Sequence, residues 1–584
     1  MADQHRHPGR RAELRRAAPP GGRARPRRLA AVALGFSGAA ALLVGRLLIV
    51  QVLDGARYAA YQQGEVDQTV ALPAARGPIY DRSGDVLALS VPRYDVVADD
   101  FLISAPRAEA AALAPVLGSS PRSLTAALSQ RNGYVVLARQ VTAATRARID
   151  ALGLAGISFV DDARRVYSGG SLFQPLLGGV NLAGEGDAAL EYQFDKVLAG
   201  RPGRELVAEA PGGLALPGGV RRVVPPRGGS GIVLTIDEPL QLEVTRDLAA
   251  QMRATHAASG IAVVEDARTG AILAMVDLVA GRRGAIGPAP TNLALTSVYQ
   301  PGSVMKLATM AWALKDGLIS PNSTFTVPDS IDVGGYTFQD AEIHPTVQMT
   351  ARQILAQSSN VGTIEISRLL GLDRLARALS AFGFGRLTGL GWPGESPGII
   401  GTPATWYGST AAAVPIGTGV AVTPMQVLDA FDAVADGGVL RPPHLVAATV
   451  TPQGVVHRVP VPRGTRILSR STAEQVVSML EGVVRQDGTA VLASIPGYTV
   501  AGKTGTAQVP SPGGGYVPGD WNATFVGFVP AQAPALAGIV VLNHPTPIYG
   551  GLVSAPVFSR VMRYALRRFD IAPPAARPAG AARR

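Results

Sequence analysis

Apolar residues form one nearly continuous run near the start of the chain, from Leu29 to Val50. About 20 such residues is the length that an α-helix needs to cross a bilayer, so we expect a membrane anchor over residues 29–53. A cleaved signal peptide is the alternative, because Ala39 opens a short stretch of small residues. We favour the anchor, since the apolar run resumes after that stretch.

The charge before this run predicts its orientation. Residues 1–28 carry nine arginines against two acids and are rich in proline and glycine, so we expect a disordered, basic tail in the cytoplasm. The rest of a single-pass protein in the cytoplasmic (inner) membrane is then extracytoplasmic. Residues 571–584, rich in alanine, proline and arginine, are also expected to be disordered.

Short strand-like and helix-like runs alternate over residues 54–225, where we find no residues suited to chemistry. Arg76 and Glu191 are interpreted as partners in structural polar contacts. A Pro/Gly-rich stretch at 224–231 marks a domain boundary. The pattern predicts a hairpin within 75–88 with Ser83-Gly84 at its tip, helices at Pro106–Leu117, Pro121–Leu128 and 187–198, and a strand at 134–137.

Strand-like runs stand at both ends of residues 226–570, with helix-like runs between them. This order favours an α+β fold in which one antiparallel sheet is assembled from the two ends of the domain. A glycine-rich stretch at 509–520 is expected to be a mobile loop. The expected strands are 232–236, 261–264, 271–276, 498–501, 524–529 and 536–542, and the expected helices include 238–252, 472–485 and 555–569.

Composition narrows the function classes. The net charge of +11 comes mainly from the two tails, and the body between them is close to neutral. Aromatic residues make up only 5% of the chain, so a nucleic-acid surface with basic and aromatic residues interleaved is not expected. The chain has no cysteine, which excludes disulfides and thiol nucleophiles, and its histidines lack the spacing of a zinc site. We expect no metal and no cofactor.

Ser303 and Lys306 stand at the start of an apolar run that extends to Asp316 and stops at Gly317. Three residues apart on a helix, they share one face, so the lysine amine can reach the serine hydroxyl. Burial lowers the pKa of a lysine toward the range in which it accepts a proton. Only four of the 54 basic residues are lysines, which makes this one less of an accident. A surface helix is the alternative, because Ser-x-x-Lys alone is a weak pattern.

Two further stretches suit a ligand cleft. The stretch Gln-Ser-Ser-Asn at 357–360 falls between helical runs, where a hydroxyl and an amide can point into a cleft, although an ordinary helix cap fits it as well. Residues 501–507 form a strand whose two glycines leave its backbone open to a ligand. This strand contains Lys503, and an edge strand with an exposed lysine is the alternative.

These motifs follow one another in the order Ser303-x-x-Lys306, Ser358-x-Asn360, Lys503-Thr504-Gly505. That order closely follows the motif set of penicillin-binding proteins and the related serine β-lactamases. The chain resembles the class B, monofunctional penicillin-binding proteins, and its Ser-Ser-Asn motif and size are similar to the septal, FtsI-type enzymes. The resemblance extends to the stretches at 76–84, 299–303, 422–424, 488–490 and 501–508.

The resemblance implies D,D-transpeptidation of peptidoglycan. Ser303 would attack the penultimate D-alanine carbonyl of a stem pentapeptide, and an amine of a neighbouring stem would resolve the acyl-enzyme. Lys306 would take the serine proton. Ser358 would shuttle a proton toward the leaving or entering amine, and Asn360 would hold the substrate amide and the lysine.

The resemblance also implies how the terminal carboxylate of the substrate is held. Lys503 would keep the local potential positive, and the hydroxyls of Thr504 and Thr506 would bond to the carboxylate. Gly505 would let the substrate backbone approach the strand edge. The oxyanion would lie between the backbone N–H groups of Ser303 and Thr506.

The implied architecture is α+β, with a single transmembrane helix, an extended N-terminal pedestal or dimerisation-type domain at 54–225, and a penicillin-recognising transpeptidase domain at 226–570. In the last of these, helices would flank a central antiparallel sheet. The implied partners are stem peptides ending in D-Ala-D-Ala, β-lactams, a SEDS-type glycosyltransferase and other divisome membrane proteins, and no nucleic acid.

Three alternatives stay open: an elongation-type class B transpeptidase, a D,D-carboxypeptidase or β-lactamase-like hydrolase, and a non-catalytic divisome scaffold. A hydrolase needs no large domain before its catalytic unit, and a scaffold needs no intact motifs. Two departures from the family pattern bear on specificity. Val304 replaces the hydroxyl residue that often follows the nucleophile, and Gly417-Thr-Gly419 stands where Gly-Gln-Gly is common.

Overall fold

The computed structural model of the chain describes residues 25–53, 67–210, 214–215, 222–511 and 513–574. Its contacts divide into two compact units, one comprising Met1–Ala71 and Arg204–Val224, the other Leu72–Gly203 and Pro225–Arg584. Most of the two tails expected to be disordered, at 1–28 and 571–584, lies outside the described residues.

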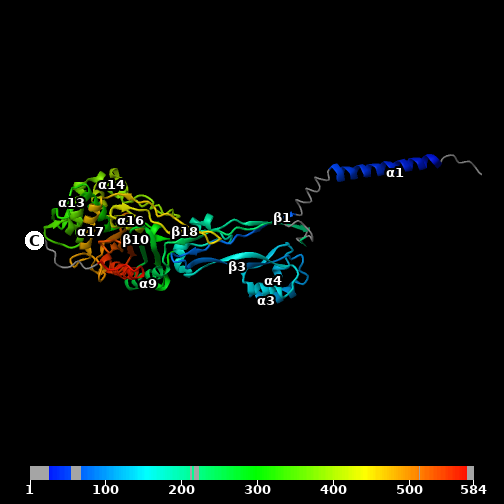
Figure 1. The fold of residues 1–584 in the computed structure, drawn as a ribbon, viewed down its shortest axis with the longest axis horizontal. Coiled ribbons are helices and arrows are strands. Elements are labelled where there is room, and N and C mark those ends of the chain that lie inside the picture. Colours follow the sequence, from blue (N-terminus) through cyan, green and yellow to red (C-terminus); the bar gives the residue numbers. More distant parts are fainter. Residues whose placement is uncertain (1–24, 54–66, 211–213, 216–221, 512, 575–584) are drawn as a thin grey trace, which may run out of the picture. The chain divides into compact units, whose positions relative to one another are not determined.

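The first unit contains the apolar helix α1 (Arg25–Leu48), which continues into a π-helical turn at Ile49–Leu53 (Figure 1). The segment Ala30–Val52 is long and apolar enough, by length and composition, to cross a membrane. The expected anchor is therefore a helix, and it begins inside the predicted basic tail.

A small sheet forms the other described part of this unit. Strand β6 pairs with β1, β7 and β8. The strands are β1 (Asp67–Leu72), β6 (Gly203–Ala210), β7 (Leu214–Ala215) and β8 (Arg222–Val224).

A seven-stranded sheet organises the N-terminal part of the second unit. Its order is β19-β18-β9-β2-β3-β4, and β5 pairs with β3 along most of the length of both strands. The strands are β2 (Ile79–Tyr80), β3 (Val86–Ala98), β4 (Val135–Val141), β5 (Ile157–Tyr167), β9 (Gly231–Leu234), β18 (Val446–Val450) and β19 (Val456–Arg458).

The two helices expected at Pro106–Leu117 and Pro121–Leu128 are confirmed as α3 (Pro106–Leu117) and α4 (Pro121–Ala127). Gly118 ends α3 with a φ of 65°, a conformation that glycine adopts without steric cost. These helices and α5 (Ala143–Asp150) pack on the sheet through a small apolar core. The helix expected at 187–198 is two short helices, α7 (Ala189–Gln193) and α8 (Asp195–Leu198).

The hairpin within 75–88 is also confirmed, with Ser83 and Gly84 in its turn. The carboxylate of Asp81 accepts hydrogen bonds from the backbone N–H groups of Ser83 (2.7 Å) and Asp85 (2.9 Å). This local side-chain bonding is what favours aspartate in turns.

Arg76 and Glu191 are buried partners, as interpreted from the sequence. Arg76 Nε donates to Glu191 over 2.7 Å, and Arg165 Nε donates to the other oxygen of the same carboxylate over 2.7 Å. Arg76 also bonds to Asp195 over 2.6 Å. The pairing offsets the cost of burying these charges, and the network ties the 189–198 helices to the sheet.

The predicted domain boundary between residues 225 and 226 lies shortly before strand β9. Strand β9, expected to open the catalytic domain, pairs in parallel with β2 and antiparallel with β18. The sheet therefore takes strands from both sides of the boundary. The division into 54–225 and 226–570 stays a prediction.

The catalytic part of the second unit contains the expected antiparallel sheet, in the order β12-β11-β10-β23-β22-β21. Neighbours β10 and β23 come from the two ends of the domain, as the sequence pattern predicts. The strands are β10 (Ser259–Asp266), β11 (Ala271–Ala280), β12 (Ile286–Pro288), β21 (Ala501–Pro510), β22 (Tyr516–Val529) and β23 (Leu536–Asn543).

Helices cover both faces of this sheet (Figure 1). On one face α9 (Glu238–Thr255) and α19 (Ala555–Arg568) pack against Ala262 and Val264, and on the other α16 (Pro424–Ala435) packs against Ile261 and Val263. Alternate residues of one strand thus enter different cores, as the pleat requires.

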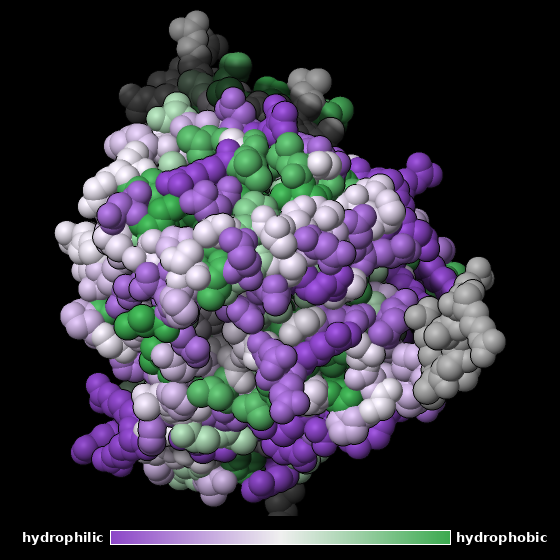
Figure 2. Space-filling model, turned by 90° about the vertical axis from the view of Figure 1, so that its left-hand side faces the viewer, coloured by the Kyte–Doolittle hydropathy of each residue, from purple (hydrophilic) through white to green (hydrophobic). Residues whose placement is uncertain are grey.

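The remaining elements lie mainly between β12 and β21. On the surface of the molecule, on the face seen in Figure 2, polar and apolar residues are interspersed, as is usual for a protein. The elements are α6 (Gln174–Leu177), α10 (Leu293–Thr296), α11 (Lys306–Lys315), β13 (Thr324–Val327), β14 (Ser330–Val333), β15 (Tyr336–Gln339), β16 (Val347–Thr350), α12 (Ala351–Ala356), α13 (Asn360–Leu370), α14 (Leu372–Ala381), α15 (Thr410–Ala413), β17 (Val439–Leu440), β20 (Thr465–Arg466), α17 (Arg470–Val484) and α18 (Gly550–Val553).

The expectation of a loop over 509–520 is wrong for most of that stretch. Strand β21 runs on to Pro510, and β22 begins at Tyr516, so a tight connection joins two long strands. The consecutive glycines at 513–515 lie in this connection, and cross-strand pairing, which local composition does not reveal, extends the strands on either side of it.

Candidate active site

Ser303 lies on a 3-10 turn, Gly302–Met305, that leads directly into α11. Gly302 has a φ of 60°, and its N–H donates to the carbonyl of Gly417 over 3.0 Å. A Cβ on Gly417 would lie 2.1 Å from the Gly302 carbonyl oxygen. Two glycines therefore let the nucleophile turn touch the Gly-Thr-Gly loop, and that departure from Gly-Gln-Gly keeps the residue that the contact needs.

Lys306 is fully buried at the start of α11. Its Nζ donates to the carbonyl of Ser358 over 2.5 Å and to Oδ1 of Asn360 over 2.7 Å. Burial lowers the pKa of Lys306 to about 7, and the carboxylate of Asp340 opposes part of that shift. A large fraction of the lysine is therefore neutral near pH 7, as a proton acceptor must be.

In the described residues the Ser303 hydroxyl makes no hydrogen bond to the amine of Lys306, although both residues lie at the start of a buried helix, as predicted. The amine is instead turned to the loop that carries Ser358. Catalytic hydrogen bonds often tighten only when substrate binds, so the predicted proton transfer stays a prediction.

Ser358 connects the two lysines of the site. It adopts a φ of 62°, which is uncommon for a residue other than glycine and costs about 1–3 kcal/mol. In this conformation its carbonyl accepts from Lys306 and its hydroxyl accepts from Lys503 Nζ over 2.8 Å. The strained backbone thus brings all three motifs into contact.

Lys503 is also fully buried, on strand β21. Its pKa lies well below the usual value for lysine, because burial disfavours the charge and the neighbouring Lys306 repels it. The exposed edge-strand lysine considered as an alternative is therefore excluded. Two amines with lowered pKa values around one hydroxyl form a route along which a proton can move.

The rest of the third motif lies along the same strand. The hydroxyl of Thr504 is buried and lies 2.8 Å from that of Thr489, whereas Thr506 is half-buried and faces a cleft. A Cβ on Gly505 would lie 2.5 Å from the carbonyl oxygen of Pro301. The glycine is therefore needed for the approach of the nucleophile turn, whatever it does for a substrate.

The sequence interpretation missed the support behind the second motif. Asp340 accepts hydrogen bonds from the backbone N–H groups of Asn360 (2.5 Å) and Val361 (2.9 Å), at the start of α13. The carbonyl of Gln339 accepts from Asn360 Nδ2 over 2.8 Å. No motif spacing points to residues 20 positions earlier, because the connection is made by tertiary packing of β15.

A cleft of about 530 Å³ lies beside these groups. Thr506 and Asn360 line it together with aromatic walls that include Tyr336, Tyr516 and Trp521. Ligand-binding clefts combine apolar walls with a few convergent polar groups in this way. Among the described residues no group of three or more His, Asp or Glu side chains could hold a metal ion.

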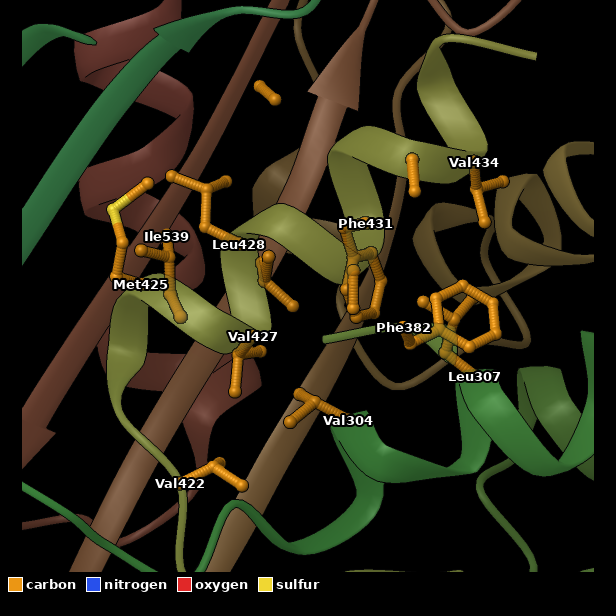
Figure 3. Close-up of a cluster of buried hydrophobic side chains, with 14 of the residues drawn as sticks. Val304, Leu307, Phe382, Val422, Met425, Val427, Leu428, Phe431, Val434 and Ile539 are labelled. Carbon is orange, nitrogen blue, oxygen red and sulfur yellow. The ribbon is translucent and has the colours of Figure 1, made fainter. Parts of the chain in front are cut away.

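Val304, the second departure from the family pattern, is 2% exposed and belongs to the apolar core. Figure 3 shows it near Val427, at the start of α16, and near Val422, just before that helix. The residue after the nucleophile thus points away from the cleft into a packed interior, where valine is favoured over a hydroxyl.

Comparison with known proteins assigns the family. Residues 260–563 match the model of the penicillin-binding protein transpeptidase domain, and residues 71–234 match that of the penicillin-binding protein dimerisation domain. The chain belongs to the penicillin-binding protein transpeptidase family. The three motifs that meet at Ser358 follow the family's motif set in residue types and in order.

Similar proteins cover nearly the whole chain. It is 34% identical to the penicillin-binding protein PbpB of Mycobacterium tuberculosis, over 90% of this chain and 82% of that protein. It is 32% identical to the peptidoglycan D,D-transpeptidase FtsI of Escherichia coli K12, over 92% and 91%. A solved structure of M. tuberculosis penicillin-binding protein 3 with aztreonam matches with a TM-score of 0.68 at 30% identity, covering 86% of this chain and 98% of that one.

Proposed function

We propose that this protein is a peptidoglycan D,D-transpeptidase that crosslinks stem peptides through an acyl-enzyme on Ser303. The observation that carries the proposal is the convergence of Lys306 and Lys503 on Ser358, behind the Ser303 turn. Relatives of similar length named as D,D-transpeptidases support it. The same site binds β-lactams, a proposal supported by structures of M. tuberculosis penicillin-binding protein 3 complexed with aztreonam and with ampicillin.

In the acylation step neutral Lys306 takes the proton of the Ser303 hydroxyl, and the oxygen attacks the penultimate D-alanine carbonyl. The negative oxygen that develops is held by the N–H groups of Ser303 and Thr506. The peptide C–N bond breaks, and the terminal D-alanine leaves after its nitrogen receives a proton through Ser358. An amine of a second stem then attacks the ester, loses a proton by the same route and releases Ser303.

Binding of the donor stem uses the edge of β21. The hydroxyl of Thr506 binds the terminal carboxylate, whose negative charge favours the protonated form of Lys503. Asn360 holds a substrate amide while its Oδ1 keeps Lys306 in place. For Thr504 we propose the same carboxylate contact, made by a hydroxyl that is already oriented by Thr489.

The nucleophile is tested by covalent labelling of the full-length protein with a fluorescent penicillin. Wild type is expected to label in proportion to protein, and Ser303→Ala to lose labelling. Ser320→Ala, an exposed serine outside the site, is the matched control. Persistent labelling of Ser303→Ala would remove Ser303 as the nucleophile.

Transfer is distinguished from hydrolysis by the product. With a stem pentapeptide donor and an amine acceptor, we expect the crosslinked dimer with loss of one D-alanine. A tetrapeptide formed without a dimer, at saturating acceptor, would favour the carboxypeptidase alternative.

We infer a septal role, because FtsI of E. coli aligns over nearly the full length of both proteins. Depletion should then give filamentous cells that fail to divide. Rounded cells would assign the protein to elongation instead, and normal division with a Ser303→Ala chain would favour the scaffold alternative.

We further propose that α1 anchors the protein in the cytoplasmic membrane with its N-terminus inside, next to a SEDS-type glycosyltransferase and other divisome membrane proteins. The arginines ahead of the helix support this orientation. Protease added to spheroplasts should digest the folded part and spare an N-terminal tag. Crosslinking of lipid-linked precursor should increase when the glycosyltransferase is added.

A further inference from the structure

His344 lies in the loop between β15 and β16, and both of its ring nitrogens face oxygen atoms. Nδ1 is 2.7 Å from the carbonyl oxygen of Pro345, and Nε2 is 3.1 Å from a carboxylate oxygen of Asp340. A carbonyl and an ionised carboxylate can only accept hydrogen bonds. Both contacts are therefore hydrogen bonds at the same time only when both nitrogens carry a proton, which makes the ring an imidazolium.

The partner of this ring is the carboxylate that holds the second motif. Its other oxygen accepts from the N–H groups of Asn360 and Val361, and the adjacent Gln339 carbonyl fixes the Asn360 side-chain amide. Asn360 in turn accepts from Lys306. One continuous set of bonds thus leads from the ring of His344 to the proposed catalytic base.

The charges along this set have opposite effects on the base. The negative charge of Asp340 raises the pKa of Lys306 against the larger effect of burial. A positive ring beside Asp340 offsets that charge. The pKa of His344 is itself raised, first by its bond to the Pro345 carbonyl and then by Asp340, with Asp329 also contributing.

We propose that His344, in its imidazolium form, is a positioning residue of the transpeptidase: paired with Asp340, it neutralises that carboxylate and keeps Lys306 available as a base. The inference rests on the proposed role of Lys306. The histidine does not touch the reacting atoms and acts through Asp340 and Asn360. It lies in a loop, which explains why no motif spacing reveals it.

The sign of the effect follows from the charges. Without the imidazolium, Asp340 acts on Lys306 unopposed and the lysine holds its proton to higher pH. The acid limb of the acylation rate then moves upward. Without the Asp340 charge, the lysine loses its proton at lower pH, and the limb moves downward.

The experiment measures the second-order rate of acylation by a fluorescent penicillin between pH 5.5 and 9, on full-length protein. We expect His344→Ala to move the acid limb up by about half a unit, which is about threefold in rate below the limb, with the alkaline plateau retained. Asp340→Asn, whose amide oxygen can still accept from the start of α13, should move the limb down. His457→Ala, an exposed histidine on β19, should leave it in place.

A drop in rate by the same factor at every pH in His344→Ala would show a merely structural role and overturn the proposal, as would unmoved limbs in both variants. If His344→Ala does not melt cooperatively, His344→Gln replaces it, because an amide of similar reach cannot supply the positive charge. A failure of this test is separable from a failure of the proposed function, since the latter would already appear as labelling of Ser303→Ala.

Discussion

The amine of Lys503 lies 2.8 Å from the hydroxyl of Ser358, and this bond joins strand β21 to the connection between α12 and α13. Strand and loop come from distant parts of the sequence, so the site exists only in the folded domain. Because both amines around Ser358 are buried, their charge states are coupled to each other and to the pH of the medium.

Acylation should lose rate as the pH falls below about 7, because the pKa of Lys306 is lowered to about 7 and the protonated amine cannot accept the serine proton. The rate should fall about tenfold for each pH unit below the limb. Lys306→Arg should abolish the reaction at every pH, since arginine stays protonated. A pH-independent rate between pH 5.5 and 8 would contradict the assignment of Lys306 as the base.

Ser358→Ala should reduce the acylation rate by about 10²-fold or more, because it removes the hydroxyl that Lys503 contacts and through which the proton is passed. The neighbouring Ser359 supplies the control. Its hydroxyl caps α13 by accepting from Gly362 N, so Ser359→Ala should cost about 1 kcal/mol of stability and far less rate. Equal rate losses in the two variants would mean that the loop matters only as structure.

Much of this fold can be predicted from the sequence, because the signals that decide it lie within or next to each element. The helix at Pro106–Leu117 carries its own start and stop signals, and the strands at 261–264 and 271–276 flank a short turn. The 509–520 stretch is different, because the pairing of β21 with β22, which the composition of neither strand shows, decides how far the two strands extend. The division at residues 225 and 226 stays a prediction, since β9, just after it, pairs with strands that lie far away in sequence on both sides.

The residues of the site likewise fall into those that a sequence signal marks and those that only tertiary structure reveals. Ser303, Lys306 and Lys503 are marked by motif order and by the rarity of lysine in an arginine-rich chain. Asp340 and His344 are not marked, because a carboxylate at a helix start and a histidine in a loop have many ordinary uses. Their role depends on which side chains β15 brings next to α13, and that information lies only in tertiary structure.

Gly505→Ala should lower the acylation rate by displacing the nucleophile turn. The added Cβ would lie 2.5 Å from the Pro301 carbonyl oxygen and 3.2 Å from Val304, so the turn that carries Ser303 must shift. A misplacement of about 1 Å costs about 10²-fold in rate. Gly513→Ala, at a glycine with nothing within 4 Å of the added Cβ, should label like wild type. Unchanged labelling of Gly505→Ala would show that the turn yields easily.

Glu265 is a buried acid without a hydrogen-bond partner for either carboxylate oxygen in the described residues. It lies on β10 and is 1% exposed. Helix α16, which contains Asp429 and Asp432, covers one face of this sheet. Burial raises the pKa of Glu265 well above its usual value, and the two aspartates raise it further. The folded protein therefore holds a proton that the unfolded chain releases above about pH 4.5.

This difference fixes the sign of a stability effect. Between the unfolded and the folded pKa the native state binds more protons, so stability is full at low pH and falls as the pH rises, by up to about 1.4 kcal/mol per unit. Glu265→Gln keeps the shape and removes the titration. The melting temperature of the variant should therefore exceed that of wild type by a few degrees at pH 8 and by less at pH 5. Glu474→Gln, on the exposed side of α17, should show no such difference. Equal shifts in the melting temperature of Glu265→Gln at both pH values would mean that the Glu265 carboxyl does not become charged on unfolding in this pH range.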